Sequence, residues 1–240
     1  MVRILTSRCG SGFLLIGTHW QRLSSTLRIR LSPATPELIR LLASSPEAVP
    51  LDHAIGKLAR GSYFYAMRSC EYLKVSGSRK TKLLLLEVIQ FHINNREISR
   101  SSPEIFDCDT VTMTFKEQKN GELMQRRTAW RTQDPILCPV NAWASIVTRI
   151  ASYPGCDKKT PVNTVMVNGQ LVQITSTMMV ASIRSAAITL GRDRLGYGSK
   201  SFDIHSIRCG AAMAMHLGGC ATFVIMITGH WKSAAFMEYI

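Results

Sequence analysis

Apolar residues recur at helical spacing along several stretches of the chain. Residues 51–75 form the longest of these, and we expect a helix over this stretch. Residues 138–150 and 176–191 show the same pattern, with Pro139 near the start of the first and Gly191 at the end of the second. The last forty residues are expected to hold two or three more helices.

Between these helical stretches the pattern changes to an alternation of apolar residues and threonines at positions 111–115. Such alternation is typical of a half-buried strand, and Asn120-Gly121 just after it is a strong hairpin signal. We therefore expect a small antiparallel sheet over residues 83–130 and a second hairpin about Asn168-Gly169. The predicted fold class is α+β, a mainly helical domain with a small antiparallel sheet.

The chain is expected to divide near residue 50. Residues 1–50 are a basic segment with a part rich in proline and serine, where Thr35 and Pro36 predict the start of one brief helix. Residues 51–240 form the main domain. No acidic residue precedes Glu37, so the N-terminal stretch could be an organellar transit segment, a basic arm on DNA, or the edge of a longer ancestral chain.

Charge adds a partner to this picture. The 240 residues carry 29 Lys and Arg against 16 Asp and Glu, a net charge of +13, which favours double-stranded nucleic acid as the partner. One dense basic cluster is expected to contact DNA: Lys74, Arg79, Lys80 and Lys82. No apolar run approaches the roughly 18 to 20 residues that cross a bilayer, so no membrane partner is expected.

The seven cysteines are scattered and never form a CxxC pair. This pattern predicts neither a disulfide framework nor a zinc site, and free thiols indicate a reducing, intracellular compartment. With DNA as the partner, that compartment is the nucleus or the nucleoid. No carboxylate cluster suggests a Mg²⁺ site, so no metal and no small-molecule cofactor is expected.

Candidate chemistry lies in four short motifs. They are Arg68 and Glu71 in "YAMRSCEYLKV", His205 and Arg208 in "HSIR", His230 in "GHW", and Tyr239 near the end. Each motif alone has an ordinary explanation, since Arg68 could simply pair with Glu71 and an HxxR pair merely shares a helix face. The spacing is the stronger signal, because His230 follows Arg208 by 22 residues and Tyr239 follows His230 by nine.

Taken together, an Arg, a hairpin Lys, HxxR, Gly-His and Tyr in this order resemble the tyrosine recombinase (phage integrase) family. "LCPVNAWASIVTRI" is also similar to a segment of integrase-like proteins of eukaryotic mobile elements. The resemblance covers residues 51–240. It implies a DNA breaking-rejoining catalytic domain that cuts and rejoins DNA through a 3′-phosphotyrosyl bond, without a cofactor, as a homo-oligomer on DNA.

The resemblance also implies roles for individual residues. Arg68 and Arg208 would grip the non-bridging oxygens of the scissile phosphate through bidentate contacts, and Tyr239 would be the nucleophile. Lys119, beside the hairpin turn, would protonate the leaving 5′ oxygen, with Lys116 as the alternative. The remaining roles are proton transfer for His205, a hydrogen bond to the phosphate for His230, and support of Arg68 for Glu71.

Two features depart from the family pattern. Only Ile240 follows Tyr239, and the helical core-binding domain of the family is missing or reduced to a fragment within residues 1–50. We therefore expect a truncated copy of a mobile-element recombinase. Three further interpretations stay open: a non-catalytic DNA-binding remnant of the same fold, a type IB topoisomerase-like enzyme that relaxes supercoils, and a plain helical domain with no DNA role.

Overall fold

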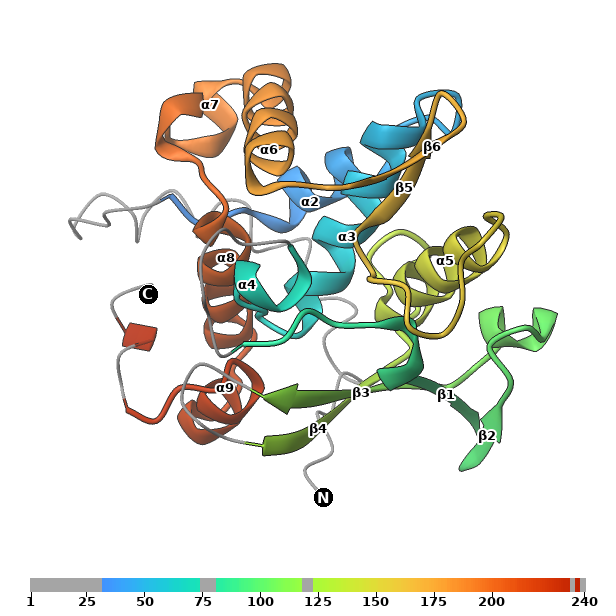
Figure 1. Cartoon of the computed structure of the whole chain (residues 1–240). Helices are drawn as coiled ribbons and strands as arrows, with labels where there is room; N and C mark the ends of the chain where they lie inside the picture. Colours follow the sequence, from blue (N-terminus) through green and yellow to red (C-terminus); the bar gives the residue numbers. More distant parts are fainter. Residues whose placement is uncertain (1–31, 74–80, 118–122, 234–235, 238–240) are drawn as a thin grey trace.

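An antiparallel sheet lies at one end of the molecule, below the helices in Figure 1. The computed structural model describes residues 32–73, 81–117, 123–233 and 236–237. In this part of the chain the sheet has the order β2-β1-β3-β4, with all neighbours antiparallel. Its strands are β1 (Ile89–Ile93), β2 (Arg96–Ile98), β3 (Thr110–Glu117) and β4 (Leu123–Trp130). The sheet predicted over residues 83–130 is confirmed, although the Asn120-Gly121 turn lies outside the described residues.

Helix α3 (Pro50–Phe64) runs through the middle of the helical part and contacts α2, α5, α6 and α8 (Figure 1). The other helices are α2 (Pro36–Ala43), α4 (Ser69–Tyr72), α5 (Pro139–Ala151), α6 (Ser176–Leu190), α7 (Arg192–Leu195), α8 (His205–Leu217) and α9 (Thr222–Thr228). The described residues also form three short 3₁₀ turns and a hairpin. The turns are η1 (Leu86–Val88), η2 (Pro103–Phe106) and η3 (Ser199–Ser201), and the hairpin consists of β5 (Thr164–Val167) and β6 (Gln170–Gln173). The fold class is α+β, as predicted.

Local sequence signals account for several of these boundaries. The Thr35 hydroxyl accepts a hydrogen bond from the Leu38 N–H at 3.2 Å and caps α2, whose first residue is a proline. Gly191, with φ 82°, ends α6 as predicted. Asn168 and Gly169, with φ of 50° and 76°, form the turn between β5 and β6.

The helix predicted over residues 51–75 is wrong in its second half. Helix α3 ends at Phe64, Ala66 has a φ of 44°, and Arg68 is the residue before the short helix α4 rather than a residue inside a long one. The apolar spacing continues through this break, but the Ala66 carbonyl accepts a hydrogen bond from Arg208. A contact made 142 residues away along the chain therefore overrides the local pattern.

The hydrophobic core runs continuously across residue 50, where the two units were expected to meet. Residues of α2 share one buried cluster with α3, α5 and the sheet. The Ala34 N–H donates to the Ser206 carbonyl at 2.8 Å, and a Cβ on Gly210 would overlap the Ala34 carbonyl oxygen. Residues 32–34 thus lie directly against α8 and the turn before it, and α2 belongs to the same core as α3.

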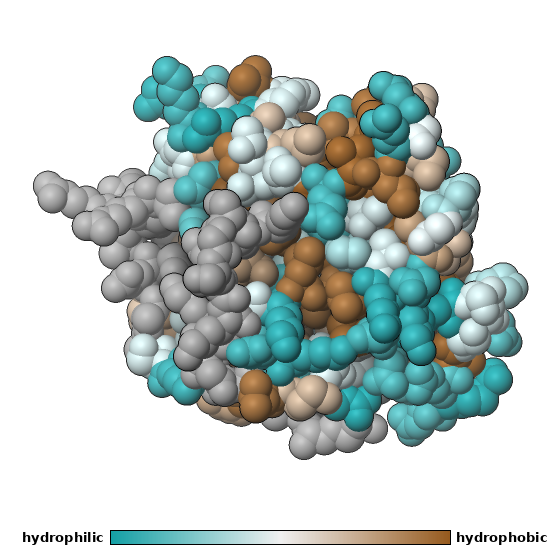
Figure 2. Space-filling model, viewed as in Figure 1, coloured by the Kyte–Doolittle hydropathy of each residue, from teal (hydrophilic) through white to brown (hydrophobic). Residues whose placement is uncertain are grey.

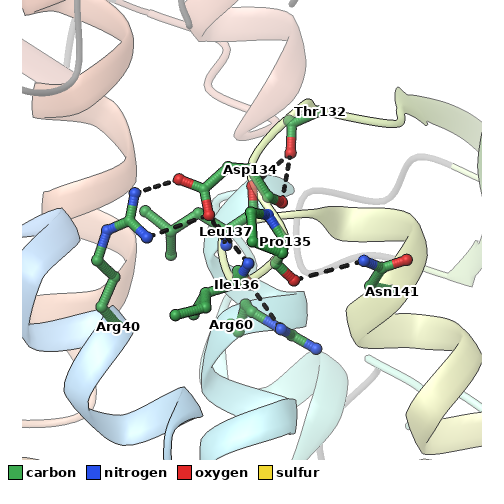
Figure 3. A network of polar contacts seen from close by, with 8 residues as sticks. All are labelled: Arg40, Arg60, Thr132, Asp134, Pro135, Ile136, Leu137 and Asn141. Atoms are coloured by element: carbon green, nitrogen blue, oxygen red, sulfur yellow. Dashed lines mark hydrogen bonds and ion pairs between the residues drawn. The ribbon is translucent and has the colours of Figure 1, made fainter.

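The loop after β4 is held in place by one carboxylate (Figure 3). Asp134 pairs with Arg40 of α2 and accepts the backbone N–H groups of Ile136 and Leu137 at 2.9 and 2.8 Å. Arg60 of α3 donates to the Ile136 carbonyl at 2.5 Å. These contacts fix how the sheet joins α5. On the molecular face of Figure 2, hydrophilic residues line the lower edge over β1 and β2, and hydrophobic residues gather near the centre.

Candidate functional site

Arg68 lies where α3 gives way to α4. Its Nη2 donates to the His230 carbonyl oxygen at 2.8 Å, and its Nη1 lies 3.3 Å from Glu71 Oε1. The other carboxylate oxygen of Glu71 accepts the Arg68 backbone N–H at 2.8 Å. The Glu71 side chain is only 1% exposed, whereas that of Arg68 is 19% exposed. Glu71 therefore anchors both the backbone and the guanidinium of Arg68 from inside the core.

The pKa of Glu71 reflects two opposing effects. Burial raises the pKa, and the Arg68 backbone N–H, the Arg68 guanidinium and the charge of Arg208 oppose the rise. A buried carboxylate next to two arginines is tolerated because its oxygens have hydrogen-bond partners. The structure thus shows a direct contact between Arg68 and Glu71, and the role of Glu71 in supporting a catalytic Arg68 stays a prediction.

Arg208 projects from the first turn of α8 into the interior and is 5% exposed. Its Nη1 donates to the Ala66 carbonyl and its Nη2 donates to the Gly229 carbonyl at 2.5 Å. The guanidinium carbon lies 3.9 Å from the centre of the Trp231 ring, in a cation–π contact. Arg68 and Arg208 thus donate to the carbonyls of two consecutive residues, His230 and Gly229.

His230 lies in the turn that follows α9, with a φ of 57°. A positive φ is uncommon for a residue other than glycine, and it persists only where surrounding contacts hold it. Here the Arg68 guanidinium binds its carbonyl, and the edge-to-face ring contact with Phe115 of β3 has centroids 4.9 Å apart. The histidine ring is 4% exposed in total. Its orientation is therefore set by at least two distant elements.

The charge state of His230 follows from its surroundings. Burial first, and then the positive charge of Arg127, lowers the pKa of His230 to about 2. Arg68 and Arg208 act in the same direction. His230 is therefore a neutral imidazole at physiological pH, with one ring nitrogen as donor and the other as acceptor.

Arg127 was missed by the sequence analysis. It is in β4, paired with the fully buried Met113 of β3, so it projects from the core-facing side of the sheet. Its Nε donates to the Ile227 carbonyl at 3.1 Å, and its Nη2 lies 3.5 Å from His230 Nδ1. The signal available in the sequence was the alternation of side chains along β4, which places the cation of Arg127 on the apolar face of the predicted hairpin.

Other predicted residues lie apart from this cluster or outside the described residues. His205 begins α8, one turn before Arg208, and its side chain is exposed. Lys116 pairs with Glu87, and Lys82 lies 3.6 Å from Glu117. The rest lie outside the described residues: Lys74, Arg79, Lys80, Lys119 and Tyr239. The structure therefore brings together Arg68, Glu71, Arg208 and His230.

Three guanidinium groups thus converge on the Gly229–His230 turn. A guanidinium keeps its charge at any physiological pH and offers five N–H donors. Arg68 uses two of its nitrogens on Glu71 and His230, so it has donors left for an anion. Positive charge with directed N–H donors in a largely buried site suits the oxygens of a phosphate diester.

Neither a metal-binding cluster nor a membrane-spanning helix occurs in the part of the chain that the structure describes. No group of three or more His, Cys, Asp or Glu side chains there could hold a metal ion. No helix among the described residues is long and apolar enough to span a bilayer. In comparisons with known proteins, no protein-family model, curated protein or solved structure matches this chain.

Proposed function

We propose that this protein cleaves and rejoins double-stranded DNA through a covalent 3′-phosphotyrosyl intermediate, as a tyrosine recombinase. One observation carries the proposal: Arg68 and Arg208, 140 residues apart, donate to the adjacent carbonyls of His230 and Gly229. Four of the residues chosen from the sequence thus lie in one place: Arg68, Glu71, Arg208 and His230. Their proximity is explained better by one shared function than by four unrelated structural roles.

The proposed reaction is a phosphoryl transfer in which one phosphate ester bond is exchanged for another. The Tyr239 phenolic oxygen attacks the phosphorus and loses its proton to His205, and the bond from phosphorus to the 5′ oxygen breaks. Lys119 gives the departing 5′ oxygen a proton, and the new phosphotyrosyl ester keeps the energy of the broken linkage for rejoining. Arg68 and Arg208 neutralise the charge that builds on the non-bridging oxygens.

The test uses the full chain and a pool of labelled duplexes, each nicked close to a randomised stretch so that the short released fragment, which carries the new 5′ hydroxyl, diffuses away. We expect a labelled adduct that resists denaturation by detergent. Tyr239→Phe should abolish it, and Tyr197→Phe is the matched control, because the buried Tyr197 hydroxyl has no hydrogen-bond partner among the described residues. An adduct that survives Tyr239→Phe would contradict the proposal, as would the lack of any adduct.

A second candidate is a DNA-binding remnant that does not cleave. The same contacts also favour this candidate, because backbone carbonyls already occupy nitrogens of both Arg68 and Arg208. This candidate predicts salt-dependent binding to duplex DNA without any adduct. Relaxation of supercoiled plasmid without site preference, with a Tyr239-dependent adduct, would instead indicate topoisomerase-like activity. If the protein acts on DNA, we place it in the nucleus or nucleoid, as a homo-oligomer on its target.

A further inference from the structure

Arg127 links the sheet to the turn that carries His230. Its Nε donates to the carbonyl of Ile227, in the last turn of α9, at 3.1 Å. Its Nη1 donates to the Arg126 carbonyl at 2.8 Å and to Gln125 Oε1 at 3.2 Å. The guanidinium is therefore held on three sides. Its remaining terminal nitrogen, Nη2, lies 3.5 Å from His230 Nδ1.

This contact bears directly on which nitrogen of His230 carries the hydrogen. A guanidinium can only donate, so Nδ1 facing it has to be the acceptor. A hydrogen on Nδ1 would point at the N–H groups of a permanent cation. A neutral imidazole has one hydrogen, and that hydrogen is then on Nε2.

We propose that Arg127 is a positioning residue that holds His230 in the tautomer with hydrogen on Nε2. Under the proposed function, on which this last step rests, Nε2–H is the donor that the ring gives to a phosphate oxygen. Phe115, with ring centroids 4.9 Å apart, fixes the plane in which that donor points. The charged groups around the ring act together: Arg127 from β4, Arg68 before α4 and Arg208 from α8 all disfavour a second proton.

The direct test is a long-range ¹H–¹⁵N correlation spectrum of the histidine side chains in the uniformly labelled full chain without DNA. The chain has 6 histidines, and His230→Asn identifies the signals of His230 by their loss. We expect the Nε2–H tautomer alone and no protonation between pH 7.5 and 5.5. A hydrogen on Nδ1 in the unsubstituted protein would overturn the proposal without need of any other variant.

Two substitutions separate positioning from general stability. Arg127→Met removes the donor and the charge, so both tautomers should become populated and the ring should take up a proton at higher pH. Arg126→Met is the matched control, since Arg126 is the neighbouring residue and bonds Gln90 at 2.9 Å on the opposite face of the sheet. It should leave the His230 signals unchanged. Unchanged tautomer in folded Arg127→Met would assign the positioning to another group and overturn the proposal.

Cleavage provides an independent arm. Where the adduct forms, Arg127→Met should slow its formation about 10-fold or more, because a misdirected donor loses contact with the phosphate. Arg126→Met should retain the original rate within about 2-fold, as expected for an exposed position outside the site. The spectra require no DNA, so the two proposals can fail separately. If the spectra show the predicted tautomer but no adduct forms, the proposed function is refuted and the role of Arg127 in positioning His230 is retained.

Discussion

The Arg68 guanidinium donates to the carbonyl oxygen of His230 at 2.8 Å, across 162 residues of sequence. The bond joins the break between α3 and α4 to the turn after α9. It also holds a histidine whose φ is 57°, a conformation that costs free energy unless its surroundings stabilise it. Arg68 thus acts on the backbone of His230, while Glu71 holds Arg68 from the other side.

Arg68→Ala is expected to lower the free energy of unfolding by roughly 3 kcal/mol, because it leaves the Glu71 carboxylate buried without its cationic partner. Urea denaturation measures the change. The control is Arg96→Ala, whose ion pair with Glu104 spans 3.9 Å between exposed side chains. Such a surface pair contributes less than about 1 kcal/mol. Equal losses in the two variants would show that the Arg68–Glu71 pair is no more important than a surface contact.

Glu71→Gln tests the same pair from the carboxylate side. Glutamine keeps an acceptor for the Arg68 backbone N–H but removes the charge, so it should partly relieve the penalty left by Arg68→Ala. In a double-mutant cycle we expect a coupling energy of about 1 to 2 kcal/mol between the two positions. Strictly additive losses of stability would mean that the two side chains do not depend on each other.

Acid should destabilise the protein through His230. The pKa of His230 is about 2 in the folded state, and its ordinary value is 6.5. Below pH 6.5 the unfolded chain therefore binds a proton at His230 that the folded chain does not bind. The contribution of His230 to the free energy of unfolding is fully present above about pH 7, and it is lost as the pH falls from 6.5 towards 2. From pH 7 to 5, the original protein should lose about 2 kcal/mol more than His230→Asn does.

Asparagine is chosen at this position because it tolerates a positive φ better than most residues. Thermal or urea unfolding across the pH range gives the two profiles. His216→Asn, at an exposed position of α8, is the control and should follow the unsubstituted protein. Parallel profiles for His230→Asn and the original chain would mean that His230 takes up protons in the folded state.

Gly210→Ala should be severely destabilising. A Cβ at this position of α8 would overlap the backbone carbonyl of Ala34, which cannot move away as a flexible side chain would. We expect a loss of about 2 to 4 kcal/mol, measured by urea denaturation. At Gly198 a Cβ would meet nothing within 4 Å, so Gly198→Ala should leave stability unchanged or raise it by up to about 1 kcal/mol. Similar effects of the two substitutions would argue against the close contact between Ala34 and α8.

Much of the local structure was predictable because it depends on near neighbours. Thr35 and Pro36 start α2, Gly191 ends α6, and Asn168-Gly169 turns between β5 and β6. In each case the physical cause is a hydrogen bond or a backbone conformation within a few residues. The alternation around β3 likewise indicated the sheet, since a strand with one buried face has a period of two.

The amino-acid sequence by itself determined the α+β class, several element boundaries, and the short list that contained Arg68, Glu71, Arg208 and His230. Only the tertiary structure decided that the chain breaks at Ala66, that Ala34 packs on α8, and that Arg127 joins the cluster. The reason is the distance in sequence over which each effect acts. Helix caps and turns are set within one turn of chain, whereas these contacts join residues 100 to 172 positions apart.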